Sequence, residues 1–453
     1  MLSAFPLGSN HCHTTNSNGN NPSTDANRIL LPIHQPSTEW KSFRRLAVIN
    51  MKRLLTLLLV LAAAATLPAA ERTLSLDSGY LRQLNSNRGL RHFGMEWTDV
   101  NSWAFDALNE AQPFGWSRDA RLLLWTGFSL YTADVYNTFY HEFGHGSRLE
   151  ALGYRTRYRI GSTGDLTRSP WTFFVRRFGD PFNDAYAVYS TSDREFTSPV
   201  SRFVNSDGTL TNDGQILINA GGLNNAMSFS GSLSDRLRER GGHVGEGLPY
   251  LLGKLDATFY GTGDTGDLKD LETYYGRKGV SVSDTDLRLY NVLATAASQS
   301  TWAYLLGLRD YVANGDTRVE AMTYRGFALP DVENYLNTRG VSWKVSSGYR
   351  LDDDTYFPFA IDFITRGAGA QDYNLGVRRR DFLLPNSEAG LDFILGSGLG
   401  VSTFYSKKLY GNLSLTVGWD HFNGRNLHGE RNAVSFKRGE TSDEIWARLS
   451  LSF

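Results

Sequence analysis

The chain has a single cysteine, Cys12, among its 453 residues. This cysteine lies in a polar stretch at residues 1–50, so the rest of the chain can form no disulfide bond. It also offers no thiolate, and a metal site beyond residue 50 must therefore use histidine, aspartate or glutamate. The same lack excludes a conventional lipoprotein, which is anchored through a cysteine behind its signal peptide.

An excess of charge of one sign is also missing, because 46 lysines and arginines are balanced by 47 aspartates and glutamates. A protein that binds nucleic acid usually carries a basic surplus that neutralises phosphates. The composition therefore predicts no nucleic-acid partner, and it says nothing about the substrate.

An apolar segment near the N-terminus is shorter than the about 20 residues that span a bilayer. Met51-Lys52-Arg53 precedes the apolar run 54–61, and small residues follow as far as Ala70. A basic start, a short apolar core and small residues describe a secretory signal peptide. We expect a signal peptide over 51–70 and an exported protein, with an internal membrane anchor as the alternative. Residues 1–50 are then a non-native or disordered leader, with translation beginning at Met51.

Residues 71–335 predict a helical or mixed region. Apolar residues spaced by three and four indicate helices from Ser117 to Gly153, with a break at Thr126-Gly127, and from Leu223 to Arg240. A further helix is expected over 284–313, with Asp284 as its N-cap. Seven apolar residues fall on one side of this helix: Leu289, Val292, Leu293, Ala296, Trp302, Leu305 and Leu306.

Residues 340–453 change to a period of two, as expected for strands with two different faces. We count about seven or eight strands of roughly ten residues, a length that crosses an outer membrane at a tilt. One of them alternates at Leu413, Leu415, Val417 and Trp419. The sequence therefore predicts an α+β fold, in which a helical region is followed by a C-terminal antiparallel β-barrel or sheet.

The last strand alternates at Ile445, Ala447, Leu449 and Leu451 and ends on Phe453. It resembles the C-terminal signature of bacterial outer-membrane β-barrels, a resemblance that covers the last quarter of the chain. The resemblance implies a location in the cell outer membrane, with membrane lipid as a partner. The alternatives are a soluble antiparallel sheet with one wet face and a location in the periplasm.

The motif His141-Glu142-Phe143-Gly144-His145 carries the chemistry of the predicted helix. Two histidines four residues apart project from the same helix face, so both imidazoles can reach one ion. Zinc accepts imidazole nitrogen, and the carboxylate of Glu142 would stand beside a water rather than on the metal. We expect Phe143 to point into the core and Gly144 to let a neighbouring element approach closely.

This motif resembles the HExxH helix of the zincin metallopeptidases. The resemblance implies a Zn2+ cofactor, His141 and His145 as metal ligands, Glu142 as general base, and a protein or peptide as substrate. It covers one helix. The extended metzincin pattern needs glycine and histidine where this chain has Arg148 and Ala151, so that branch is excluded.

A third metal ligand is not identified by the sequence. Two carboxylates, Asp235 and Glu239, are spaced four apart on the helix that follows Gly221-Gly222, and a glycine-rich loop next to it holds His243 and Glu246. A carboxylate from a second helix would suit a zincin-like site, yet Asp235 and Glu239 lie opposite Leu233 and Leu237, which favours a solvated helix face. An ordinary loop is the simplest explanation of His243, and none of the four is chosen.

Three hypotheses follow for the function. The first is a zinc-dependent metallopeptidase of the bacterial envelope, in which Glu142 activates a metal-bound water for peptide-bond hydrolysis. The second is a non-catalytic outer-membrane β-barrel protein, such as a pore, adhesin or assembly factor, with a chance motif. The third is a degenerate zincin-like fold that is kept for binding.

Overall fold

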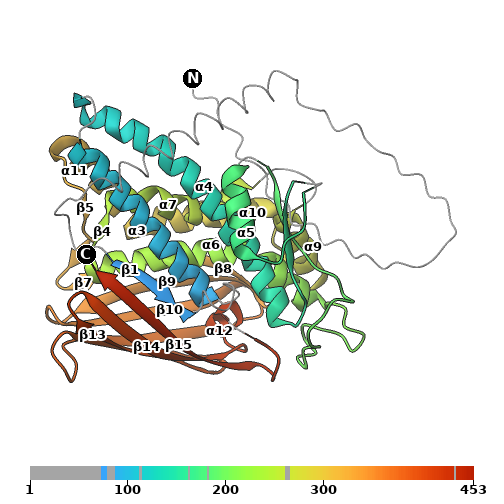
Figure 1. Cartoon of the computed structure of the whole chain (residues 1–453). Coiled ribbons are helices and arrows are strands. Elements are labelled where there is room, and N and C mark those ends of the chain that lie inside the picture. The colour runs from blue at the N-terminus through green and yellow to red at the C-terminus, as the bar shows by residue number, and fades with distance from the viewer. Residues whose placement is uncertain are drawn as a thin grey trace, which may run out of the picture.

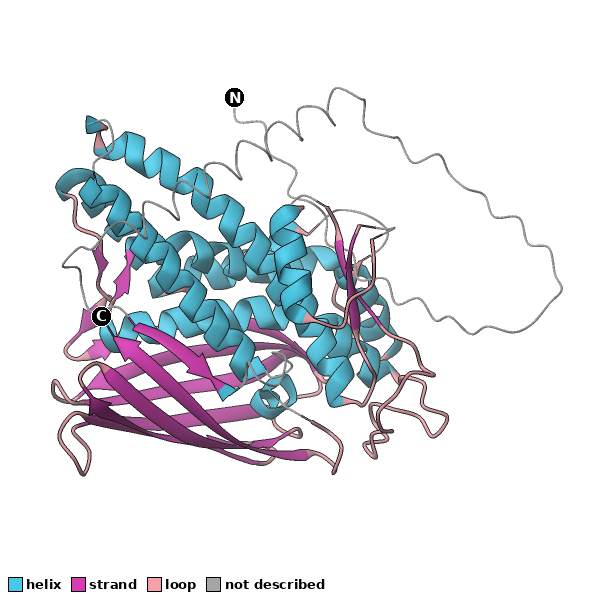
Figure 2. Cartoon of the chain, viewed as in Figure 1, coloured by secondary structure: helices cyan, strands magenta, loops and turns pink. Residues whose placement is uncertain are grey.

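The computed structural model describes residues 73–78, 87–111, 115–161, 164–180, 183–260, 266–432 and 435–452 (Figure 1). The predicted leader, the predicted signal peptide and Phe453 lie outside these residues. In the described part, a layer of helices covers one face of a large twisted sheet (Figure 2).

Three long helices form the centre of the helical layer: α3 (Asn87–Ala111), α4 (Arg118–Ala151) and α6 (Asn212–Arg240). The shorter ones are α5 (Pro170–Gly179), α7 (Gly247–Lys254), α8 (Asp256–Phe259), α9 (Asp267–Arg277), α10 (Asp284–Ala297), α11 (Gln299–Asn314) and α12 (Leu427–Asn432). Within the described segments, no helix combines the length and the apolar character needed to cross a membrane.

Helix α4 begins and ends close to the predicted positions. Ser117 is its N-cap and accepts a hydrogen bond from the Ala120 amide at 3.3 Å, and Gly153 follows the helix with a φ of +96°. The predicted break at Thr126-Gly127 is wrong. Thr126 donates its hydroxyl hydrogen bond to the Leu122 carbonyl of the preceding turn, and one glycine costs a 34-residue helix only about 1 kcal/mol.

The other two predicted helices differ in extent. Helix α6 begins at Asn212, with Thr211 as its N-cap, so the Gly221-Gly222 pair lies inside the helix rather than before it. The predicted 284–313 helix is two helices, α10 and α11, which meet at Ser298. The N-cap of α10 is Ser283, which forms a reciprocal capping box with Asp286.

The large sheet has eleven strands, all paired antiparallel, in the order β1-β15-β14-β13-β12-β11-β10-β9-β7-β6, with β8 also on β9. These are β1 (Thr73–Asp77), β6 (Thr323–Tyr324), β7 (Phe327–Ala328), β8 (Asp331–Asn337), β9 (Gly340–Arg350), β10 (Thr355–Gly367), β11 (Gln371–Arg380), β12 (Ser387–Leu395), β13 (Leu399–Tyr410), β14 (Leu413–Asn423) and β15 (Thr441–Ser452). The α+β prediction and the antiparallel C-terminal sheet are confirmed. Strands β9 to β15 are the seven strands found in the region 340–453, where about seven or eight were predicted.

The described strands do not close into a barrel. Strands β1 and β6 stand at the two ends of the pairing order, and β8 packs against α6 and α10 instead of pairing with β1. Of the two predicted forms, a barrel or a sheet, the described strands form a sheet. It also takes in β1 and β6 to β8 from the region predicted to be helical or mixed. Two smaller sheets pair β2 (Arg157–Ile160) with β3 (Ala185–Val188) and β4 (Gly242–His243) with β5 (Arg318–Val319).

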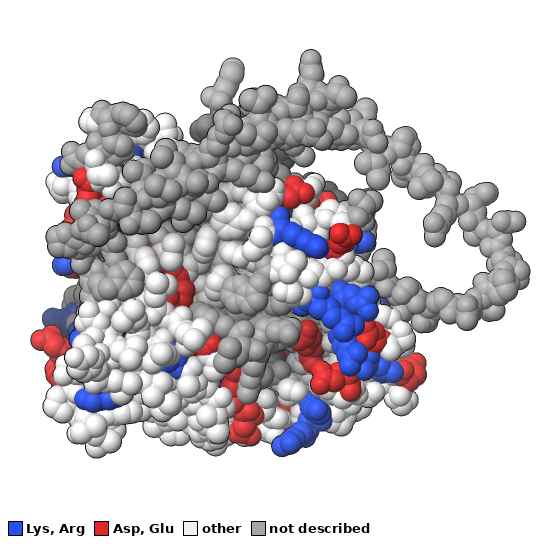
Figure 3. All heavy atoms as spheres, in the orientation of Figure 1, with Lys and Arg blue, Asp and Glu red and all other residues white. Residues whose placement is uncertain are grey.

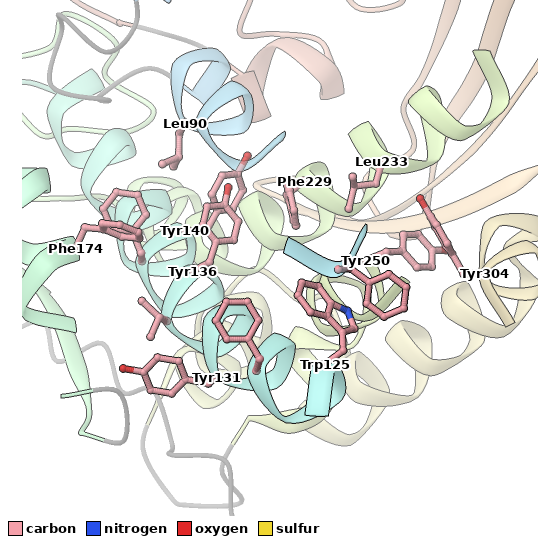
Figure 4. Close-up of a cluster of buried hydrophobic side chains, with 14 of the residues drawn as sticks. Leu90, Trp125, Tyr131, Tyr136, Tyr140, Phe174, Phe229, Leu233, Tyr250 and Tyr304 are labelled. Carbon is pink, nitrogen blue, oxygen red and sulfur yellow. The ribbon is translucent and has the colours of Figure 1, made fainter. Parts of the chain in front are cut away.

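Aromatic side chains fill the core between α3, α4 and α6 (Figure 4). Phe143, from the middle of the HExxH motif, is fully buried there and stacks on Tyr158 with ring centroids 4.2 Å apart. The prediction that Phe143 points into the core is confirmed. This packing fixes the rotation of α4 about its axis and therefore the direction of its two histidines.

Candidate metal centre

His141 and His145 lie one turn apart on α4, fully buried, with ring centroids 4.8 Å apart. Their Nε2 atoms converge on one carboxylate: each lies 3.0 Å from Oδ2 of Asp267, the first residue of α9. Donor atoms of these three residues all lie within 4.8 Å of one another. Donors around a tetrahedral zinc ion are separated by about 3.3 Å, so the group could hold a metal ion after the more distant donors move closer together.

Unpaired buried atoms at the centre fit a cation. Within the described residues, His145 Nε2, Asp267 Oδ1 and Glu142 Oε1 are buried and make no well-aligned hydrogen bond, although His145 Nε2 lies 3.0 Å from Asp267 Oδ2. Buried polar atoms are normally paired, because leaving one unpaired costs free energy. An ion among two imidazoles and a carboxylate would give the first two atoms a partner or a charged neighbour.

Both histidines are oriented through their other ring nitrogen. His141 Nδ1 lies 2.8 Å from Oδ2 of Asp256, and His145 Nδ1 lies 2.7 Å from the carbonyl oxygen of Ile218. Asp256 is held in turn by the side-chain amide of Asn137 at 2.7 Å. Because both Nδ1 atoms face acceptors, they would keep their ring protons when a metal is bound, and the two Nε2 atoms would be left to coordinate it.

The charges of the centre follow from its neighbours. Burial opposes ionisation of Asp267, but His145 and His141 outweigh it and hold the pKa of this carboxyl below its usual value. Burial also acts against a charged His141, whereas Asp256 and Asp267 raise its pKa well above the usual value. An ionised carboxylate facing two imidazoles is the donor set that a divalent cation needs.

Glu142 lies beside this group without belonging to it. Its Oε2 accepts a hydrogen bond of 2.7 Å from the Ala187 amide in β3, and its Oε1 is the unpaired atom noted above. Burial raises the pKa of Glu142 to about 7, although His145 and His141 act to lower it. A carboxyl with a pKa near neutrality can both accept and return a proton.

Tyr260 adds a hydroxyl at the same point. It donates to Asp267 Oδ2 at 2.7 Å and lies 2.9 Å from His141 Nε2. Burial raises the pKa of this phenol well above its usual value, so the hydroxyl keeps its proton. The centre thus has one neutral hydrogen-bond donor next to the three groups that could hold a metal ion.

Glycines let α6 reach the centre. A Cβ on Gly144 would lie 2.3 Å from the Gly221 carbonyl oxygen, and one on Gly222 would lie 2.4 Å from His141 Nε2. Real Cβ atoms do not approach so closely, so the two helices meet here only because side chains are missing. The predicted role of Gly144 in a close approach is confirmed, and the Gly221-Gly222 pair is its counterpart.

The four residues considered as third ligand all have other partners. Asp235 pairs with Arg238 and Glu239 with Arg240. His243 lies 3.0 Å from Asp106, and Glu246 lies 2.9 Å from Arg236. None belongs to the group that could hold a metal ion among the described residues, in which the third member is Asp267. An acid in the first turn of a helix is common, so the sequence holds no signal that would single out Asp267.

Comparisons of the chain with models of protein families, with curated proteins and with solved structures find no match.

Changing Asp256 to asparagine is expected to weaken metal binding by about 10- to 100-fold, because the charge that orients His141 is lost. Titration with a competing chelator measures this affinity. The control is Asp119→Asn, at an exposed position of α4, the helix that carries His141. This variant should bind the metal as tightly as the wild type. Equal affinity of the Asp256 and Asp119 variants would contradict the role of Asp256.

Proposed function

We propose that this chain is a zinc-dependent metallopeptidase of the bacterial envelope. The observation that carries the proposal is that a buried carboxylate, Asp267, converges with both histidines of the HExxH motif. A chance motif gives no reason for a third ligand to be present and buried at the right point. The envelope location rests on the signal-peptide pattern that begins at Met51.

The donor set favours zinc among the common metals. Calcium and magnesium prefer oxygen ligands, and zinc is bound by two imidazoles and a carboxylate in several hydrolytic enzymes. Three protein ligands would leave a fourth position for water or substrate, as in catalytic rather than closed structural zinc sites.

Different residues of the chain would bind the ion, transfer the proton and stabilise the negative charge on the substrate. Zinc held by His141, His145 and Asp267 would supply Lewis-acid chemistry, lowering the pKa of a water toward about 7 and polarising a carbonyl. Glu142 takes the proton from the attacking water through Oε1 and passes it to the leaving amine, while the Ala187 amide holds Oε2 in place. With a substrate bound, Tyr260 would turn its single hydroxyl hydrogen bond from Asp267 Oδ2 to the negative oxygen that develops on the substrate.

One observation favours a second candidate, a metal that only stabilises the fold. His141, Glu142, His145 and Asp267 have no exposed surface in the described structure, whereas a substrate must reach the metal. In this case zinc would bind with the same ligands and no peptide would be cleaved.

Removing the metal tests the proposal. Treatment with 1,10-phenanthroline is expected to abolish cleavage of an unfolded protein substrate, and added zinc should restore it, with unchanged far-ultraviolet circular dichroism. Cleavage that survives complete removal of zinc would contradict a metallopeptidase. Zinc bound at one per chain with no cleavage of any protein or peptide offered would support the structural metal.

A further inference from the structure

The polarity of the large sheet is the reverse of that in a water-soluble protein. On β14, the side chains of Leu415, Val417 and Trp419 are exposed on the face away from the helices. Thr416 and Asp420, which alternate with them, are buried beneath the helical layer. On β15 the outward Ile445 is 78% exposed. The apolar side chains therefore point outward and the polar ones inward.

The pairing register extends this reversal across the sheet. Four polar residues are successive cross-strand partners on the inner face of β12 to β15: Asp392, Ser402, Asp420 and Glu444. Four apolar residues are successive partners on the outer face of β10 to β13: Phe359, Leu375, Phe393 and Val401. The visible part of this surface, at the bottom of Figure 3, is covered largely by uncharged atoms.

The inner face is organised as a polar interior. Arg378 pairs with Asp392 at 2.6 Å, and Lys344 from β9 pairs with Glu333 at 3.0 Å. A cavity of about 300 Å³, lined mainly by charged and polar residues, lies between this face and the ends of α3 and α6. Charged groups thus occupy the place where a soluble α+β protein would bury its apolar sheet face.

Helices α10 and α11 show the same reversal. The seven apolar residues predicted to share one side of a helix are exposed, with Trp302 at 53%, whereas Asn291, Thr295 and Gln299 are buried. This side adjoins the outer sheet face through Tyr290 of α10, whose ring lies 5.7 Å from that of Trp343 on β9. Trp343 is the cross-strand partner of Phe363 on β10.

We propose that the outer face of the sheet and the outward side of α10 and α11, together called the apolar surface, are embedded in the hydrocarbon of a lipid bilayer. In water, this arrangement would destabilise the folded chain in two ways. Charged groups are removed from water, and leucine, phenylalanine and tryptophan are exposed to it. In hydrocarbon the same arrangement is favourable. An apolar exterior alternating with a polar interior along each strand is the pattern of membrane-embedded sheets.

Two further features fit this occupant better than a second copy of the chain. Strands β9 to β15 have 9 to 13 residues, and about 9 to 11 tilted residues cross the hydrocarbon. The long edges of the sheet are covered, because β1 contacts α3 and β8, which pairs with β9, packs against α6 and α10. Among the described strands, only the two-residue strand β6 is exposed at an end of the pairing order, so few unpaired backbone groups would meet lipid. A dimer needs only one flat patch, whereas this surface continues from the sheet onto two helices.

Fluorophores attached to single cysteines test the proposal on the whole chain. In a Cys12→Ser background, an environment-sensitive dye is placed through Leu375→Cys, Ile445→Cys or Leu305→Cys, with Val175→Cys on α5, 67% exposed, as the control. Vesicles of phosphatidylethanolamine and phosphatidylglycerol should shift the emission of the first three dyes to the blue. Nitroxides on the lipid tails should quench these dyes, and a water-soluble quencher should not.

An arginine variant supplies an independent readout. Leu375→Arg is expected to lower partition into the vesicles by roughly 30-fold or more, and Val175→Arg should leave it unchanged. Removing the metal by His141→Ala should not affect partition, which separates this proposal from the peptidase. Quenching of all three surface dyes by the water-soluble quencher, or their protection by dimer formation without lipid, would overturn the lipid-embedded surface.

Discussion

Replacing Glu142 with glutamine is expected to reduce kcat for peptide cleavage by about 100- to 10,000-fold, the range that a general base contributes. Glutamine keeps the size of the side chain and its hydrogen bond to the Ala187 amide, but it cannot take a proton from water. Zinc content should stay at that of the wild type, because His141, His145 and Asp267 are unchanged. Steady-state kinetics and metal analysis on the same preparation measure both quantities.

The control for this variant is Glu272→Gln on α9, where the partly exposed glutamate pairs with Lys269 at 2.7 Å. It should cleave as fast as the wild type. If the Glu142 variant retained full activity with zinc bound, Glu142 would not be the general base. If it lost zinc together with activity, Glu142 would act on the metal rather than on water.

Replacing Asp267 with alanine is expected to weaken zinc binding by about 100-fold or more, beyond the effect of losing a residue that only orients a ligand. Two imidazoles then remain, and the Tyr260 hydroxyl loses its acceptor. Activity should fall in proportion to the metal lost and recover in part at high zinc concentration. Competition with a chromophoric chelator measures the affinity.

Asp235→Ala is the matched control, because the sequence also offers Asp235 as a ligand, whereas the fold pairs it with Arg238 at the surface. This variant should bind zinc like the wild type. A large loss of zinc from the Asp235 variant and none from the Asp267 variant would show that the third ligand has been assigned incorrectly.

The sequence predicts the residues of the centre that are close together in the chain, and it does not identify Asp267, which is distant in the chain. His141, Glu142 and His145 share one turn of helix, so their spacing alone places them together. Asp267 lies more than a hundred residues further along the chain and is brought in by the packing of α9 against α6. No periodicity encodes that contact, which depends on the tertiary fold.

The strands after residue 340 are also predictable, because alternation marks two different faces. Which face lies against the helices is not contained in the alternation. In water the apolar face of a sheet or helix is expected to be buried, and Leu289 and Ile445 instead point outward. The outward apolar side chains of the helix and of the strand would have one cause if the surroundings of this chain were lipid.

We infer that His141, His145 and Asp267 together bind one zinc ion. X-ray absorption at the zinc edge, on the purified full chain loaded with zinc, tests this most directly. We predict one zinc per chain, with two imidazole nitrogens and carboxylate or water oxygens at about 2.0–2.2 Å, and loss of one imidazole in His145→Ala. A chain that binds no zinc, or whose zinc spectrum is unchanged in His145→Ala, would contradict the claim.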